Sequence, residues 1–124
     1  MFAEVKAMMQ NYISGDDYDE QIILEIKACA VDLTSSAEII LPGIVDITRT
    51  HNAATTSEPE SWTITDNSTI TDPLVFKVFA TWCALNIGNP PNADRLQKAY
   101  DSLKGQMRQN NLYTHFRTTE EAEG

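Results

Sequence analysis

Basic side chains, histidine and glycine are all scarce in this sequence of 124 residues. Lys and Arg number 9 against 18 Asp and Glu, so the formal net charge is −9. Because binding to nucleic-acid phosphate needs clustered Lys and Arg, we exclude a protein whose main contact is DNA or RNA phosphate. None of the 5 glycines builds a phosphate-cradling loop, and neither of the 2 histidines, His51 and His115, lies in a metal-protease motif.

Cysteine is scarce as well. The 2 cysteines, Cys29 and Cys83, both lie in apolar patterns of helical spacing, and we expect reduced thiols in the core of a cytosolic protein. No basic and apolar leader begins the sequence, so we expect no export. No Ser or Cys lies in a nucleophile motif either. We therefore expect no catalytic residue, no metal, no cofactor and no enzymatic activity.

Long apolar runs are limited to one stretch, Leu74 to Ile87, which is too short to cross a bilayer, so we expect no membrane contact. Asp72 and Pro73 suit a helix N-cap and a first helical position, and Gly88 suits the residue after a helix end. A helix that is apolar around most of its circumference is normally enclosed by other elements. We predict that this is the central helix of the domain. The aromatic residues expected in its core are Phe76, Phe79, Trp82 and Tyr100.

Helical spacing of apolar residues predicts three further helices. The first is short and covers residues 1–11. The second begins at Asp17, with Glu20 in capping-box spacing, and frays at the serine pair near its end. The last covers residues 93–109 and follows a cap at Asn92.

Residues 44–71 interrupt the helical pattern. Thr, Ser, Asn and Asp dominate there, and two pieces alternate as strands do, Val45–Arg49 and Trp62–Thr65. We expect the second piece to form a hairpin with Thr69–Thr71 across a turn at Asp66-Asn67. A connection of this length is commonly either functional or mobile, and both interpretations stay open.

The predicted fold class is mainly α. It is a small helical bundle of three long helices plus a short N-terminal helix, with a long β-hairpin-prone loop, in a single domain of residues 1–124. Residues 110–124 form a C-terminal arm in which the apolar residues Leu112, Tyr113 and Phe116 precede an acidic run. These apolar residues either fold back onto the core or dock on a partner.

Acidic residues cluster at the start of the second predicted helix: Asp16, Asp17, Asp19 and Glu20. The cluster lacks the central glycine and the distant glutamate of a calcium loop. Carboxylates at a helix N-terminus are stabilised by its free N–H groups, which favours helix capping over metal binding. A metal-dependent enzyme built on this cluster is one alternative function. An acidic regulatory protein that binds its target as a free monomer or dimer is another.

Three segments stand in a recognisable order: EVKAMM…ISGDDYDEQI, TDPLVFKVFATWCALNIG and NADRLQKAYDSLKGQM…YT. In this order they resemble the head–tail connector (head-completion adaptor) proteins of long-tailed phages. The resemblance skips residues 44–68 and depends on order, spacing and the Asp-Pro helix start. The sequence departs from that family in the longer connection before Asp72, and in Ile87, where an aromatic residue often precedes the glycine.

The resemblance implies a structural subunit at the head–tail interface of a virion, assembled in the host cytoplasm. In that family the subunits form a ring, usually a dodecamer, under the portal protein. Duplex DNA passes through the ring without sequence-specific binding, and the ring is a platform for a stopper or tail-completion protein. We expect the interface with neighbouring subunits and partner proteins to include Trp62, Ile64, Ile70, Leu112, Tyr113 and Phe116. Removal of residues 110–124 should then abolish attachment to the portal without unfolding the domain.

Overall fold

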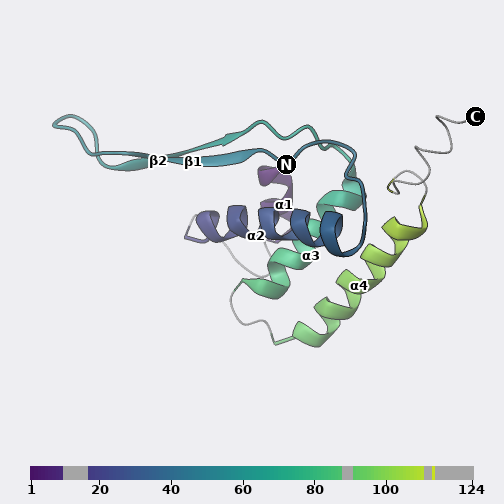
Figure 1. Ribbon diagram of the computed structural model, residues 1–124. Helices are drawn as coiled ribbons and strands as arrows, with labels where there is room; N and C mark the ends of the chain where they lie inside the picture. The colour runs from purple at the N-terminus through teal and green to yellow at the C-terminus, as the bar shows by residue number, and fades with distance from the viewer. Residues whose placement is uncertain (10–16, 88–90, 111–112, 114–124) are drawn as a thin grey trace, which may run out of the picture.

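The computed structural model describes residues 1–9, 17–87, 91–110 and 113. Four α-helices, a π-helix and an antiparallel pair of strands form the regular structure of this part (Figure 1). In chain order they are α1 (Phe2–Met8), α2 (Asp19–Val31), the π-helix η1 (Asp32–Ser36), β1 (Ile47–Asn52), β2 (Ser61–Asp66), α3 (Pro73–Asn86) and α4 (Ala93–Gln109). None of these helices is long and apolar enough to cross a membrane.

The predicted fold class, a mainly α bundle of three long helices plus a short one, is wrong. The described residues form a mixed α and β fold, in which four helices pack together and a two-stranded antiparallel sheet projects from them. The difference arises in residues 44–71. Their β-branched Thr and Ile side chains suit extended backbone, and six successive residues of one strand pair with six of the other.

α3 lies at the centre of the helical body and contacts α1, α2 and α4 (Figure 1). The Asp72 side chain accepts a hydrogen bond from a backbone N–H of the first turn at 2.9 Å, and Pro73 takes the first helical position. Phe79 is fully buried, and Trp82 is half-buried at the edge of the core. The prediction of an enclosed central helix is confirmed. Its predicted end signal, Gly88, lies outside the described residues.

α2 begins later than predicted. Tyr18 takes the N-cap position without a side-chain cap hydrogen bond, so the predicted capping box of Asp17 and Glu20 is wrong. Asp19 instead pairs with Lys6 at 2.8 Å between nitrogen and oxygen, which ties the start of α2 to α1. At the other end α2 passes into η1, and this helical segment ends at Ser36, so the predicted end at the serine pair is confirmed.

A network of polar side chains joins η1 to α4. The Tyr100 hydroxyl and the Lys104 ammonium group both donate to the Asp32 carboxylate, the latter at 3.2 Å. The buried Tyr100 ring also packs on Trp82, with 5.1 Å between ring centroids. Burial raises the pKa of the Tyr100 hydroxyl, which keeps it protonated as the donor of this network.

The bounds of α4 match the prediction. Asn92 takes the N-cap position, although its side chain makes no cap hydrogen bond. α1 ends at Met8, and the last residues of the predicted first helix lie outside the described part. The buried residues of α4 are Leu96, Tyr100, Leu103 and Met107.

The strand pairing differs from the predicted one. β1 and β2 pair along their whole lengths, and residues 53–60 connect them. The predicted turn at Asp66 and Asn67 is therefore wrong, and so is the predicted strand after it. The chain runs straight on after β2, and the Thr69 N–H donates to the Ile44 carbonyl at 3.0 Å. An Asp-Asn pair lacks the glycine that favours a two-residue turn.

Asp66 anchors the base of the hairpin to α1. Its carboxylate accepts hydrogen bonds from the Phe2 N–H at 2.6 Å and the Ser68 N–H at 3.0 Å, and it lies 2.9 Å from the Met1 ammonium nitrogen. Burial by itself raises the pKa of Asp66, but the hydrogen bonds from the ammonium group and these two N–H groups outweigh it and lower the pKa to about 2. The ionised carboxylate therefore stabilises the folded state.

We expect Asp66→Asn to lower the free energy of unfolding at neutral pH by about 1–2 kcal/mol. The folded-state pKa lies below the ordinary value of 3.8, so this stabilisation is present above that value and is lost as the pH falls toward 2. Wild type should thus lose more stability than the variant between about pH 5 and about pH 2. Urea unfolding at both pH values, followed by circular dichroism, measures the two losses. Equal losses would contradict this role of Asp66.

Tyr113 brings the C-terminal end of the described chain back to the core. The residue is 3% exposed, and its hydroxyl donates to the Asp72 carboxylate. Its carbonyl accepts a hydrogen bond from the Ile40 N–H at 2.7 Å. The apolar residues after α4 were expected either to fold back onto the core or to dock on a partner. Tyr113 folds back onto the core.

Candidate assembly surface

We call residues 47–66, which comprise β1, β2 and their connecting loop, the arm. Figure 1 shows the arm running beside α2 and then past the end of the helical body. Every residue from 50 to 63 is exposed. A two-stranded hairpin without a third strand or a covering helix is marginally stable by itself. The outer half of the arm gains no stability from the core and leaves its faces and edges open to a partner.

Alternation along the strands gives the arm two different faces. The face toward α2 carries Arg49 and His51 from β1, and Trp62 and Ile64 from β2. The opposite face is uncharged and rich in hydroxyl groups. Its exposed residues are Thr48, Thr50, Asn52, Ser61, Thr63 and Thr65.

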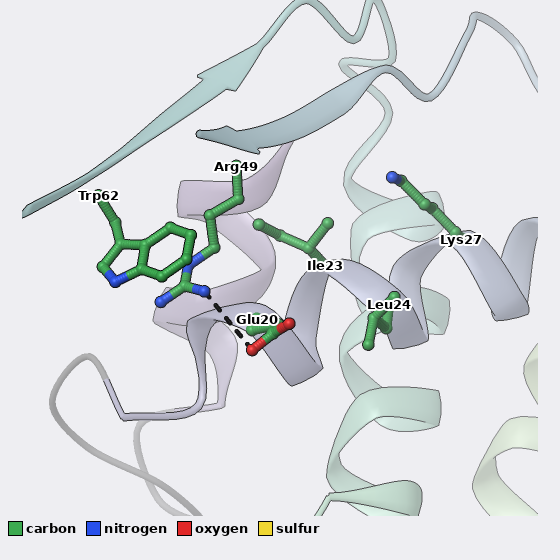
Figure 2. Close-up of a pocket in the computed structure, with 6 residues that line it drawn as sticks. All are labelled: Glu20, Ile23, Leu24, Lys27, Arg49 and Trp62. Atoms are coloured by element: carbon green, nitrogen blue, oxygen red, sulfur yellow. Dashed lines mark ion pairs between the residues drawn. The ribbon is translucent and has the colours of Figure 1, made fainter. Parts of the chain in front are cut away.

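A stack of side chains holds the arm against α2 (Figure 2). The Arg49 guanidinium carbon lies 3.7 Å from the centre of the Trp62 ring, and a guanidinium nitrogen lies 3.5 Å from a carboxylate oxygen of Glu20. A cation over an indole at an exposed site contributes about 0.5–1 kcal/mol. The stack borders a pocket of about 180 Å³ whose other lining residues are Ile23, Leu24 and Lys27.

His51 extends this stack toward the end of the arm. Its ring centroid lies 4.6 Å from that of Trp62, and its Nε2 is hydrogen-bonded to Glu60 Oε1 at 2.6 Å. Trp62 thus contacts both Arg49 and His51 while 48% of its surface stays exposed. A ring that is fixed in place and still exposed can anchor a protein interface, because few degrees of freedom are lost on binding.

α2 adds apolar surface beside the arm. Leu24 is 57% exposed and Val31 is 61% exposed, and the exposed Ala28 lies between them on one helical face. Single exposed leucines are normal on a protein surface, whereas a stripe that adjoins an exposed tryptophan indicates an interaction site. We call this set of residues, Trp62, Leu24, Ala28 and Val31, the arm–α2 surface.

The four described residues that were predicted to form an interface do not share one surface. Trp62 belongs to the arm–α2 surface, and Ile64 is half-buried against the core at the base of the arm. Ile70 and Tyr113 are core residues and offer almost no surface to a partner. The other two lie outside the described part of the chain: Leu112 and Phe116.

From the sequence alone, Arg49, His51 and Leu24 were not predicted to lie at the candidate surface beside Trp62. The sequence predicted a turn at Asp66-Asn67, which would pair the strand of Trp62 with the residues that follow it. That pairing does not place the side chains of β1 beside Trp62. In the observed register His51 lies directly opposite Trp62. The available signal was the alternation of β1, which places Arg49 and His51 on one face of the strand.

Two residues of the acidic cluster at the start of α2 face cations of the protein itself. Asp19 pairs with Lys6, and Glu20 pairs with Arg49 of the arm. Asp16 lies outside the described residues. Within the ranges that the structure describes, no group of three or more His, Cys, Asp or Glu side chains could hold a metal ion. The charges of Asp19 and Glu20 serve contacts between elements.

Both cysteines are free and buried, which confirms the prediction of core thiols. Burial raises the pKa of Cys29, and it raises the pKa of Cys83 to about 12. Because the thiolate is the reactive form of cysteine, neither side chain is prepared for nucleophilic chemistry at neutral pH.

Among the described residues, the arm–α2 surface is therefore suited to contact with another protein. It combines a fixed aromatic ring, an apolar stripe and paired charges at its border. Comparison with protein-family models, with curated proteins and with solved structures gives no match for this chain. Its function is accordingly inferred from the arm and from the helical body that carries it.

Proposed function

We propose that the chain is a structural virion subunit, a phage head–tail connector that forms a ring under the portal protein. The ring extends the channel through which duplex DNA passes and is the attachment platform for a stopper or tail-completion protein. The observation that carries the proposal is the arm, which extends past its own helical body and leaves residues 50–63 exposed. Such an extension is suited to reach a neighbouring subunit.

Ring formation requires lateral contact surface on every copy. The arm–α2 surface can supply it, because Trp62 and the stripe of Leu24 and Val31 offer apolar area that the monomer does not bury. Burying one large apolar side chain contributes about 1.5–3 kcal/mol. The same contact is repeated at each junction of a ring, so a modest contribution per copy stabilises the closed assembly.

The charge of the chain fits a channel for DNA. A wall that must let duplex DNA slide should not hold its phosphates, and a chain of net charge −9 meets this condition. The outward face of the arm consists of Thr, Ser and Asn and has no cationic side chain. This face could line a channel without binding the DNA backbone tightly.

Imaging of the purified chain mixed with the portal protein of the same phage tests the proposal. Negative-stain averages should show an additional ring below the portal, and mass measurement should give one copy of the chain per portal subunit. The portal alone is the control. If the chain forms no complex with the portal at any accessible concentration, the proposed function is wrong.

Trp62→Ala should weaken ring formation on the portal at least tenfold. A tryptophan at the centre of an interface typically contributes about 2 kcal/mol or more to binding. Thr65→Ser, on the uncharged face of the same strand, is the matched control and should assemble like wild type. Sedimentation of the chain with the portal measures both variants. Normal assembly of Trp62→Ala would show that the lateral contact lies elsewhere.

A further inference from the structure

The loop at the end of the arm is ordered by its own hydrogen bonds. The Thr55 N–H donates to the Glu58 carbonyl at 2.8 Å. The Thr55 hydroxyl accepts hydrogen bonds from the Glu58 N–H at 3.0 Å and the Ser57 N–H at 3.4 Å. The loop therefore keeps its shape without support from the helical body, and a pre-organised loop loses little entropy when it docks. We call residues 55–59 the tip.

A groove of about 370 Å³ lies between α1, α3 and α4. Ala80 and Ala84 of α3 are four residues apart and lie on one helical face, where their small side chains leave space between the flanking helices. Met8 of α1 is 45% exposed at the groove, and Leu96 of α4 lines it from the other side. The groove is mainly apolar, and the flexible thioether of Met8 can adapt to an occupant.

Lys77 supplies a positive charge at the edge of this groove. It is the only charged residue in the sequence of α3, and its side chain is exposed. Among the described residues it forms no ion pair. An ammonium group beside an apolar groove favours an occupant that is acidic and partly apolar. In a chain of net charge −9 such segments are common, and the tip sequence Glu58-Pro59 is one of them.

The tip cannot fill the groove of its own chain. Figure 1 shows the end of the arm on the opposite side of the molecule from α4, and all tip residues are exposed. The Glu58 carboxylate, like Lys77, has no ion-pair partner in the described part of the chain. Two complementary patches at different places on one chain form a head-to-tail contact between copies, and such contacts close into rings when the rotation allows it.

We propose that the tip of each copy docks in the α1–α3–α4 groove of the next copy, with Glu58 facing Lys77. The occupant of the groove is thus a second copy of this chain. This inference rests on the proposed function and adds to it a second lateral contact, distinct from the arm–α2 surface, with its direction and its residues. It also gives a reason why the arm is long, exposed and ordered at its end.

Cysteine cross-linking tests the contact directly. Ser57→Cys places a thiol on the tip and Thr81→Cys places one in the groove, while both natural thiols are buried. The two variants are mixed with the portal and oxidised, and the products are separated without reducing agent. We expect a covalent dimer from the mixture and little from either variant alone. Rings that form normally but yield no mixed dimer, or that cross-link Ser57→Cys chains to one another, would overturn the inference.

A charge exchange gives a second and independent measurement. Lys77→Glu and Glu58→Lys should each weaken ring formation on the portal at least tenfold, and the double variant should recover most of the loss. Lys98→Glu, an exposed charge reversal on α4, is the matched control and should assemble like wild type. All four variants should keep the wild-type melting temperature within about 2 °C, since exposed substitutions change stability little.

The two levels of the proposal fail in different ways. If wild type forms no ring with the portal, the proposed function fails and the tip contact fails with it. If wild type forms rings while both single charge variants assemble normally, or the double variant recovers nothing, the tip contact alone is wrong.

Discussion

Phe79→Ala is expected to lower the free energy of unfolding by about 3–5 kcal/mol. Phe79 lies in the middle of α3 and is fully buried, and α3 contacts the other three α-helices of the described chain. Removing the ring takes away buried apolar area and leaves a cavity, because a close-packed core relaxes only in part. Small domains are stable by only about 5–15 kcal/mol, so the variant loses a large share of its stability.

Urea unfolding followed by circular dichroism measures this loss. Trp62→Ala is the control, because it removes a larger aromatic side chain from a position that is 48% exposed. Its expected loss is below about 1 kcal/mol, the size of the contact with Arg49. Similar losses in both variants would mean that Phe79 is not enclosed, and the architecture described here would be wrong.

This comparison also separates folding from assembly. The core lies among the helices and the base of the arm, and it includes no residue between 50 and 63. Substitutions in the core therefore change stability, whereas substitutions on the outer arm change contacts with other molecules. A variant that assembles poorly but unfolds like wild type can be assigned to a contact surface, either the arm or the groove proposed to receive the tip.

The helices that were predicted correctly are those whose start or buried face is determined by residues close together in the sequence. Asp72 and Pro73 start α3 because the carboxylate caps free N–H groups and the proline needs no hydrogen-bond partner there. The buried face of α4 follows from apolar residues three and four positions apart. Neither inference depends on a distant part of the chain.

The hairpin could not be located in the same way. Both strands are rich in Thr and Ser, and the outer half of each is exposed on both faces. A strand with no buried face specifies its pairing register weakly, so the hydrophobic pattern did not choose between possible partners. The connecting loop, residues 53–60, contains no glycine that would mark a tight turn.

The candidate surface was predicted only at Trp62, which stands out as an aromatic residue in a polar segment. Leu24 and Val31 carried a usable signal, because they are apolar residues that lie outside the buried stripe of α2. Contacts between distant segments left no local pattern. The ion pair of Asp19 with Lys6 is an example, and it needs the packing of α1 on α2 before it can be recognised.

Tyr113→Ala is expected to lower the free energy of unfolding by about 3 kcal/mol. The Tyr113 ring is buried, and its hydroxyl donates to the carboxylate of Asp72, the residue that caps α3. Burial, together with this hydrogen bond, raises the pKa of the Tyr113 hydroxyl to about 12, so it remains a donor at neutral pH. Tyr113→Phe keeps the ring and loses the hydroxyl, so its expected loss is smaller, about 1–2 kcal/mol.

Two truncated chains test whether this stabilisation belongs to Tyr113. One ends at Tyr113 and the other ends just before it, and thermal unfolding of both measures the difference. We expect a difference of about 3 kcal/mol, because the shorter chain loses the buried Tyr113 ring and the Ile40 N–H loses its acceptor, the Tyr113 carbonyl. The sequence-based expectation that residues 110–124 can be removed without unfolding the domain would then hold only if the remaining stability exceeds this loss. Equal stability of the two truncated chains would instead show that the contacts of Tyr113 with Asp72 and Ile40 contribute nothing to the fold.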